Sequence, residues 1–300
     1  MHLNTIVAIT DFSAAAEHAL DRAALVAASH QARLRILYGA DTPNPGLADP
    51  HARLEQRARQ LARRHGIAVI ALAAEADGAG GVARQALRAA ADADLLVLDR
   101  RTPSGWRHLL CSTVLARILR ASPCPVLVVQ RAAQGAYRRT LVAVDFSDAS
   151  AALVRYAGGL QAEALLELYH AIDTRDEARL RSAEASMQAL KAYRTQMRER
   201  AQHRMLPLAT AHHARRNRVA MTIGAGDPAR QLAVQHEATG ADLIAVGHAR
   251  RPALFEWLTG SVAGRLLGGV DCDVLVFPNA FAVPQGRRAT PGCAVSRQSA

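Results

Sequence analysis

Aromatic residues and lysine are scarce in this chain of 300 residues. Phe, Trp and Tyr together make up 4% of the sequence, and Lys191 is its only lysine. With so few rings, the chain lacks the aromatic platforms on which single-stranded nucleic acids stack. The hydrophobic fraction of 50% must come mainly from Ala, Val, Leu and Ile. That is enough to fill the cores of two domains of ordinary size.

Cysteines are also few, and long apolar segments are missing. The four cysteines form no Cys-x-x-Cys pair and no dense framework, so free thiols in a reducing compartment are expected. Met1 to Asp11 contains no charged region that leads into an apolar stretch, so no signal peptide is indicated. No uncharged run reaches the ~18 residues of a membrane span. We therefore expect a cytoplasmic protein that does not insert into a membrane.

The charge of the chain is strongly basic, at +11, which suggests a nucleic-acid partner. The arginines, however, occur in short groups spread along the chain, such as Arg63-Arg64 and Arg100-Arg101. These groups fall on predicted helix faces or in loops, and no recognition motif accompanies them. We expect nonspecific attraction to phosphates at most.

Three motifs occur twice, in the same order, which indicates an internal duplication. The repeated pairs are Ile6–Ser13 and Thr140–Ser147, Ala93–Leu98 and Ala241–Val246, and Cys124–Val129 and Cys272–Phe277. The copies lie 134 residues apart at the first motif and 148 at the last, so the second copy has gained 14 residues. The gain falls between Asp173 and Met221, where Glu177 to Arg204 is predicted as one long charged helix. We expect the apolar stripe of this helix to pack on its own sheet by default. Binding of a partner protein or of an apolar ligand by the stripe is an alternative.

Strands and helices alternate within each copy. The predicted strands are continuous apolar runs, as in a parallel sheet that is buried on both faces. Such alternation predicts right-handed crossovers and a mostly parallel, doubly wound α/β sheet. We expect domains at residues 1–131 and 140–278, a linker at 132–139 and a disordered tail at 279–300.

The ordered set of motifs resembles the universal stress protein family. The likeness lies in the strand that ends in Asp-Phe-Ser, the Ala-Asp-Leu-Ile-Ala-Val-Gly strand, the Gly226-Asp227-Pro228 turn and the closing Cys-Pro-Val-Leu-Val-Val strand. It implies two flavodoxin-like (adenine nucleotide alpha hydrolase-like) domains, each with a five-stranded, mostly parallel sheet. It also implies that Val126–Val129 pairs with Val274–Phe277 as an intramolecular pseudo-dimer, and a further homodimer stays open.

Some members of this family bind ATP through a Gly-x-x-Gly-x9-Gly-Ser/Thr motif, whose glycines let backbone N–H groups approach the phosphates. The second copy keeps Gly247 and Gly260-Ser261 but has Arg250 in place of the middle glycine. An arginine there either prevents close approach of a phosphate or binds the phosphate itself. The resemblance also places a carboxylate beside the adenine, here Asp145 after Val144.

The first copy has lost these glycines. Asp99, Thr102 and Ser112-Thr113 stand in their places, and Asp99 would repel a phosphate. Its adenine-side carboxylate would be Asp11. A structural role is an alternative for both copies, with Ser13 and Ser147 as helix N-caps and the aspartate holding the turn.

Other motifs have structural explanations. The segment Gly224–Ala229 fits the dinucleotide fingerprint, but it follows the third strand of its copy, so a tight turn with Pro at the first helical turn explains it better. His236-Glu237 lacks the second histidine of zinc proteases and is expected at the surface. No nucleophile elbow, P-loop lysine or catalytic dyad is present, so we assign neither a metal nor a catalytic residue.

The leading expectation is a stress-response regulator that senses ATP or AMP through its second domain. The expected site consists of Val144, Asp145, Gly247, Arg250, Gly260 and Ser261. Two alternatives stay open, namely an interaction scaffold that binds no nucleotide and a weak ATPase that depends on Asp145.

Overall fold

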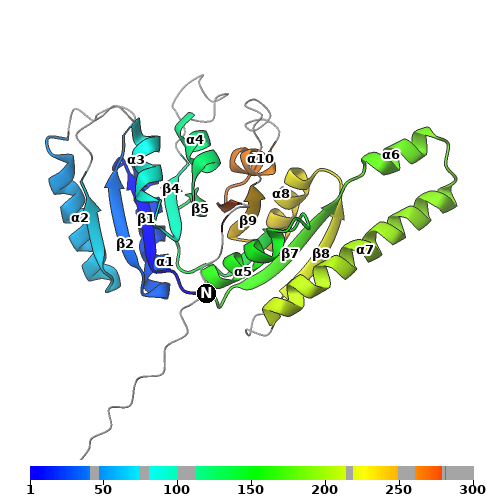
Figure 1. The fold of residues 1–300 in the computed structure, drawn as a ribbon, viewed down its shortest axis with the longest axis horizontal. Helices are drawn as coiled ribbons and strands as arrows, with labels where there is room; N and C mark the ends of the chain where they lie inside the picture. The colour runs from blue at the N-terminus through cyan, green and yellow to red at the C-terminus, as the bar shows by residue number, and fades with distance from the viewer. Residues whose placement is uncertain are drawn as a thin grey trace, which may run out of the picture.

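The computed structural model describes residues 1–40, 47–73, 81–100, 113–213, 219–248, 261–278 and 281. Strands and helices alternate through both halves, with one additional helix in the second (Figure 1). The first half contains β1 (Thr5–Thr10), α1 (Ala14–His30), β2 (Arg33–Tyr38), α2 (Pro50–His65), β3 (Val69–Leu72), α3 (Gly81–Ala89), β4 (Leu95–Asp99), α4 (Thr113–Ala121) and β5 (Val126–Val129).

The second half repeats this pattern with a longer connection between its second and third strands. It contains β6 (Arg139–Ala143), α5 (Ser150–Leu160), β7 (Leu165–Ile172), α6 (Arg175–Ser182), α7 (Met187–His213), β8 (Val219–Ala225), α8 (Pro228–Thr239), β9 (Leu243–His248), α10 (Val262–Gly269) and β10 (Asp273–Pro278). Of the segment expected to be a linker, Arg139 is the first residue of β6, and Tyr137 is buried.

All the strands join one ten-stranded sheet in the order β3-β2-β1-β4-β5-β10-β9-β6-β7-β8. Neighbouring strands run parallel within each half, so each half is a doubly wound, five-stranded sheet as predicted. The halves meet where β5 and β10 pair antiparallel, with Leu127 opposite Leu275. This contact confirms the predicted pairing of the closing strands, and it covers an edge of each half that would otherwise expose unpaired backbone groups.

Each face of the sheet carries its own apolar core, because successive side chains of a strand point to opposite faces. Ile6 and Ala8 of β1 pack in one core, with residues of α1, α2, α5 and α7. Val7 and Ile9 pack in the other, with residues of α3, α4, α8 and α10. The continuous apolar runs of the strands are therefore explained by burial on both faces.

A buried polar cluster joins the two halves. Asp273, at the start of β10, accepts hydrogen bonds from Arg22 Nε at 3.1 Å, Tyr137 Oη at 2.6 Å and the backbone N–H of Gln130 at 2.9 Å. Arg22 also donates to the carbonyl of Gly135 at 2.6 Å. Burial raises the pKa of Asp273, although the Arg22 charge opposes this. The cluster ties α1 to the chain between the halves and to β10.

The insertion of the second copy forms two helices, so the prediction of one helix from Glu177 to Arg204 is wrong. Helix α6 ends at Ser182, and Glu184 adopts a left-handed conformation with φ of 54°. The hydroxyl of Ser186 then accepts the backbone N–H of Ala189 at 3.2 Å, which favours a new helix start. In Figure 1, α6 and the first turns of α7 project beyond the sheet as an arm.

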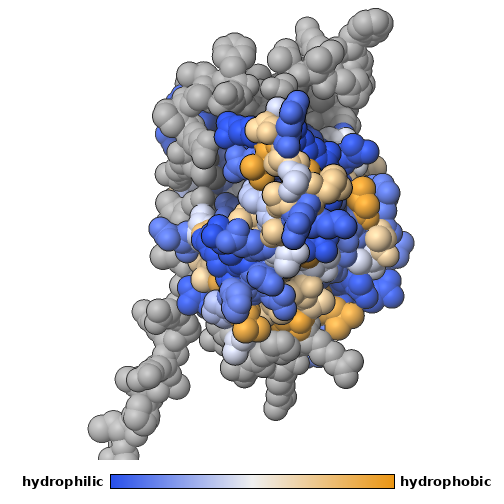
Figure 2. Space-filling view, turned by 90° about the vertical axis from the view of Figure 1, so that its right-hand side faces the viewer, coloured by the Kyte–Doolittle hydropathy of each residue, from blue (hydrophilic) through white to orange (hydrophobic). Residues whose placement is uncertain are grey.

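The rest of α7 packs on the sheet, as expected by default. Ala201, Met205 and Ala209 are buried at a spacing of four residues, and Met205 and Ala209 belong to a core that includes strand residues. By contrast, Met187 at the start of the helix is 66% exposed. Viewed from the side of the arm, the surface is mainly hydrophilic with scattered apolar patches (Figure 2).

Of the tail expected at 279–300, only Phe281 lies within the described residues. Its ring contacts the rings of Tyr156 and Phe277, with centroids 5.9 and 5.6 Å away. Among the helices that the structure describes, none combines the length and the apolarity that crossing a bilayer requires.

Candidate functional site

The candidate site lies where the chain order of the second sheet reverses. From β6 the chain moves outward to β7 and β8 and then returns to add β9 on the other side of β6. β6 and β9 are parallel neighbours, with Val142 opposite Ala245. Asp145 follows β6 and Gly247 is the second-last residue of β9, so both lie at the carboxyl ends of these strands. Doubly wound sheets bind their ligands at this place.

Asp145 is held as an oriented, ionised carboxylate. Its Oδ1 accepts hydrogen bonds from Ser147 N at 2.9 Å, Ser147 Oγ at 2.7 Å and Ser150 Oγ at 2.9 Å. Burial raises the pKa of Asp145, but these hydrogen bonds outweigh that effect and bring its pKa below the usual value. The group therefore carries a negative charge at neutral pH.

The two serines that bind Asp145 overturn one structural prediction. Ser147 is not a helix N-cap, because α5 begins only at Ser150 and its N-cap residue, Ala149, makes no side-chain capping bond. In the first half the prediction is confirmed: Ser13 caps α1, and its hydroxyl accepts the N–H of Ala16 at 3.2 Å. In the second half, the hydroxyls of Ser147 and Ser150 donate to the Asp145 carboxylate, and no side chain caps the start of α5.

Val144, the residue before Asp145, is buried, and both of its backbone groups have partners. Its N–H donates to the carbonyl of Tyr169 at 2.8 Å, and its carbonyl accepts from His170 Nδ1 at 2.7 Å. Burial lowers the pKa of His170, so a neutral imidazole is favoured. A base that binds through the Val144 carbonyl must share this acceptor with His170.

The phosphate side of the predicted site lies partly within the described residues. Gly247 is exposed at the end of β9. Ser261 is the N-cap of α10, and its hydroxyl accepts the N–H of Gly264 at 3.0 Å. This hydroxyl retains its own hydrogen for a ligand. Arg250 and Gly260 lie outside the described residues.

Phe146 and its neighbours at this site were missed from the sequence. The Phe146 backbone has φ of 59°, a strained conformation for a residue with a Cβ. Its ring lies 4.3 Å from the His170 ring and 4.4 Å from the Arg204 guanidinium, and Arg204 also donates to the Phe146 carbonyl at 3.0 Å. The ring thus contacts both an imidazole and a cation.

The first half contains the same arrangement with other residues. Phe12 has φ of 62°, and its ring lies 5.4 Å from the Tyr38 ring and 4.7 Å from the Arg53 guanidinium. The repeated phenylalanine of the Asp-Phe-Ser motif was the available signal, but phenylalanine does not favour a positive φ, so the sequence did not predict this conformation.

The phosphate side of the first half differs from that of the second. Asp99 is 2% exposed at the end of β4, whereas its counterpart Gly247 is exposed. Asp11 Oδ1 accepts the N–H of Ser13 at 2.9 Å and so closes the turn before α1. Thr102 and Ser112 lie outside the described residues.

Gly226-Asp227-Pro228 acts as a helix start. Asp227 is the N-cap of α8, and its carboxylate accepts the N–H of Arg230 at 2.9 Å. Arg265 of α10 donates to both carboxylate oxygens of Asp227, at 2.6 and 2.5 Å. Pro228 occupies the first turn, which confirms the tight-turn interpretation of this segment.

His236 is buried, so the expectation of a surface histidine is wrong. Its Nδ1 pairs with the carbonyl of Ala241 at 2.7 Å and its Nε2 with Asp271 at 2.8 Å, because α8 ends against the loop before β10. Among the described residues, no group of three or more histidine, cysteine or acidic side chains could hold a metal ion.

Comparison with known proteins decides the family. A model of the universal stress protein family matches residues 2–130 and, separately, residues 136–278. The chain belongs to the universal stress protein family. Both halves match, so the chain is a tandem member of this family, as the repeated motifs predicted.

Solved structures share the fold of this universal stress protein along nearly its whole length. A universal stress protein from Archaeoglobus fulgidus DSM 4304 covers 92% of this chain and 99% of its own, with 17% identity and a TM-score of 0.64. A functionally unknown protein from Pseudomonas aeruginosa PAO1 covers 92% of both chains, with 20% identity and a TM-score of 0.65. No curated protein matches the chain.

Proposed function

We propose that this protein is a cytoplasmic stress-response regulator whose second half, residues 140–278, binds ATP or AMP. Residues 1–131 are its structural partner, and 132–139 connect the two. The observation that carries the proposal is the pair formed by the ionised Asp145 and the exposed Gly247 at the carboxyl ends of adjacent strands. The proposal is one of binding and assigns no catalytic residue.

Each part of the proposed site has a chemical role. The Asp145 carboxylate accepts hydrogen bonds from the exocyclic amine of adenine, beside the backbone of Val144. Gly247 lets phosphates approach the backbone, and Gly260-Ser261 supplies N–H groups and a hydroxyl at the start of α10. Arg250 contributes a guanidinium to the phosphates.

Calorimetric titration with ATP and with AMP tests the proposal. We expect Asp145→Asn to weaken binding by roughly tenfold or more, the effect of losing a hydrogen bond to a charged acceptor. Asp11→Asn is the matched control in the first half, and we expect it to leave the affinity unchanged. Asparagine keeps an oxygen for the N–H of the following serine in both variants, so both should fold.

A second substitution tests the phosphate side. Gly247→Asp gives the second half the residue that stands at Asp99 in the first, and it should abolish binding through repulsion and steric contact. If wild-type protein takes up no nucleotide at millimolar concentration, or if the two asparagine variants bind equally, the assignment is wrong.

An interaction scaffold that binds no nucleotide is the second candidate function. One observation favours it: the Val144 carbonyl already accepts a hydrogen bond from His170, and the Phe146 ring lies against that imidazole at an interplanar angle of 40°. The same titration separates the candidates, because a scaffold would give no heat with either nucleotide.

A further inference from the structure

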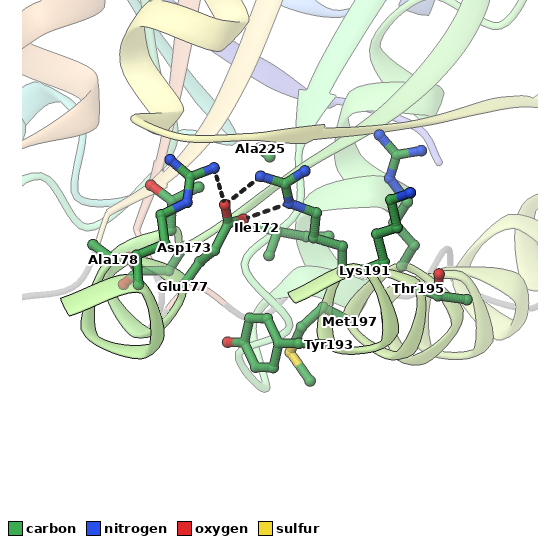
Figure 3. Close-up of a pocket in the computed structure, with 13 residues that line it drawn as sticks. Ile172, Asp173, Glu177, Ala178, Lys191, Tyr193, Thr195, Met197 and Ala225 are labelled. Atoms are coloured by element: carbon green, nitrogen blue, oxygen red, sulfur yellow. Dashed lines mark hydrogen bonds and ion pairs between the residues drawn. The ribbon is translucent and has the colours of Figure 1, made fainter. Parts of the chain in front are cut away.

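A large cavity lies outside the nucleotide site, against the arm formed by α6 and α7 (Figure 3). Its volume is about 800 Å³, which is within the range of small-molecule sites. Ile172 and Ala225, at the carboxyl ends of β7 and β8, form one side, and residues of α6 and α7 form the others. It shares none of the residues of the proposed nucleotide site. The insertion of the second copy builds it.

The ion pairs of the cavity leave an excess of positive charge. Glu177 accepts hydrogen bonds from Nη2 and Nε of Arg194, at 2.5 and 3.0 Å, and pairs with Arg181 at 2.8 Å. Within the part of the chain that the structure describes, the two remaining cations of the lining, Lys191 and Arg198, have no ion-pair partner. Asp173, the other acidic residue of the lining, pairs with Arg175. The cavity therefore presents two cations without an ion-pair partner, beside two carboxylates that are already paired.

The cations follow one face of α7. Lys191, Arg194 and Arg198 are spaced at i, i+3 and i+7, so they lie on the same side of the helix and span about 10 Å along its axis. Figure 3 shows the Glu177 carboxylate between Ala225 on one side and Tyr193 and Met197 on the other. Glu177 demonstrates that an acidic group fits among the arginines of the arm.

We propose that this cavity binds a small organic polyanion, with two or more phosphate or carboxylate groups, through Lys191 and Arg198. The two cations leave the helix at points about 10 Å apart along its axis, a spacing that a polyanion matches by placing a separate acidic group on each. The apolar surface of Ile172 and Ala225 covers the body of the ligand. This site is separate from the nucleotide site, and the proposal stands without the nucleotide assignment.

Lys191 makes the proposal directly testable, because it is the only lysine of the chain. Reductive methylation with formaldehyde and a borane modifies Lys191 and the α-amino group, and mass spectrometry gives the rate at each. With pyrophosphate or citrate as the probe, we expect slower methylation of Lys191 and an unchanged rate at the α-amino group. Sodium chloride at matched ionic strength is the control for screening.

Substitutions locate the protection. Arg198→Gln should raise the concentration needed for protection about tenfold, the loss of one charge-assisted hydrogen bond. Arg59→Gln, at an exposed arginine of α2, should leave it unchanged, and so should Asp145→Asn. The proposal is overturned if sodium chloride protects Lys191 from methylation as well as the polyanions do. It is also overturned if Lys191 of the Arg198→Gln variant is protected at the same polyanion concentration as in wild type, or if Lys191 of the Asp145→Asn variant is not protected.

Discussion

Replacing Arg22 with alanine should uncouple the two halves more than any surface substitution of the same kind. Arg22 and Asp273 form an ion pair in which the side chains are 7% and 1% exposed. The guanidinium also lies 4.0 Å from the centre of the Tyr137 ring. Arg22→Ala therefore leaves a carboxylate in the junction with no cation and removes a contact that covers a tyrosine ring.

The size of the effect follows from burial. Removing one partner of a buried ion pair costs about 3–5 kcal/mol, because the other charge stays out of water without compensation. The matched control is Arg265→Ala, which breaks an ion pair with Asp227 in which the side chains are 41% and 40% exposed. A pair that exposed contributes at most about 1 kcal/mol. The two arginine variants should thus differ several-fold in their loss of stability.

The pH dependence of the effect has a definite sign. Burial raises the pKa of Asp273 in the folded chain above its value in the unfolded chain, so folding favours the protonated acid. The stability associated with this group is present below the unfolded pKa and is lost as the pH rises through the folded pKa. Without Arg22 the folded pKa rises further, so the deficit of Arg22→Ala should grow from mildly acidic to mildly alkaline pH.

Urea unfolding followed by circular dichroism, at one mildly acidic and one mildly alkaline pH, measures the free energy of unfolding of each variant and how it changes with pH. The reasoning is refuted if Arg22→Ala costs no more than Arg265→Ala, or if its deficit is the same at both pH values.

Three further outcomes are expected. Gly224→Ala should destabilise by about 1–3 kcal/mol, because the new Cβ would come within 1.9 Å of a tyrosine hydroxyl. Gly268→Ala, which meets no atom within 4 Å, should not destabilise in the same urea assay. Burial raises the pKa of both Cys124 and Cys272 to about 12, so iodoacetamide should label them only after unfolding, as peptide mapping would reveal. Ser13→Ala should cost about 1 kcal/mol through loss of the cap of α1.

The strands were predictable because their environment is uniform. A strand buried on both faces is apolar at nearly every position, as in β5 and in Val274–Phe277 of β10, and this pattern does not depend on which residue lies opposite. The pairing of Val126–Val129 with Val274–Phe277 followed from the family resemblance rather than from the pattern. What periodicity alone could not predict was the buried cluster around Asp273, since its partners come from distant parts of the chain.

Two local features escaped prediction for a different reason. The break between α6 and α7 occurs at Glu184, and the strained turn after β6 occurs at Phe146, each with a positive φ. Neither glutamate nor phenylalanine favours a positive φ, so the residue types do not predict these two turns. Contacts with the surroundings accompany it: Arg204 and His170 contact the Phe146 ring, and the ion pair of Glu177 with Arg194 joins α6 to α7 across the other turn.

The difference between the two halves arises from where a helix begins and from one residue outside the shared Asp-Phe-Ser motif, Ser150 in place of Ala16, so the motif itself could not separate them. In the first half α1 starts directly after Ser13, so the serine hydroxyl is used by the helix. In the second half the helix starts two residues later in the motif, and the hydroxyls of Ser147 and Ser150 are left to bind Asp145. These hydrogen bonds bring the pKa of Asp145 down and fix the orientation of its carboxylate. A shift of half a helical turn, together with Ser150 where the first copy has Ala16, therefore adds two hydroxyl donors to a turn-closing aspartate at the point where the sheet order reverses.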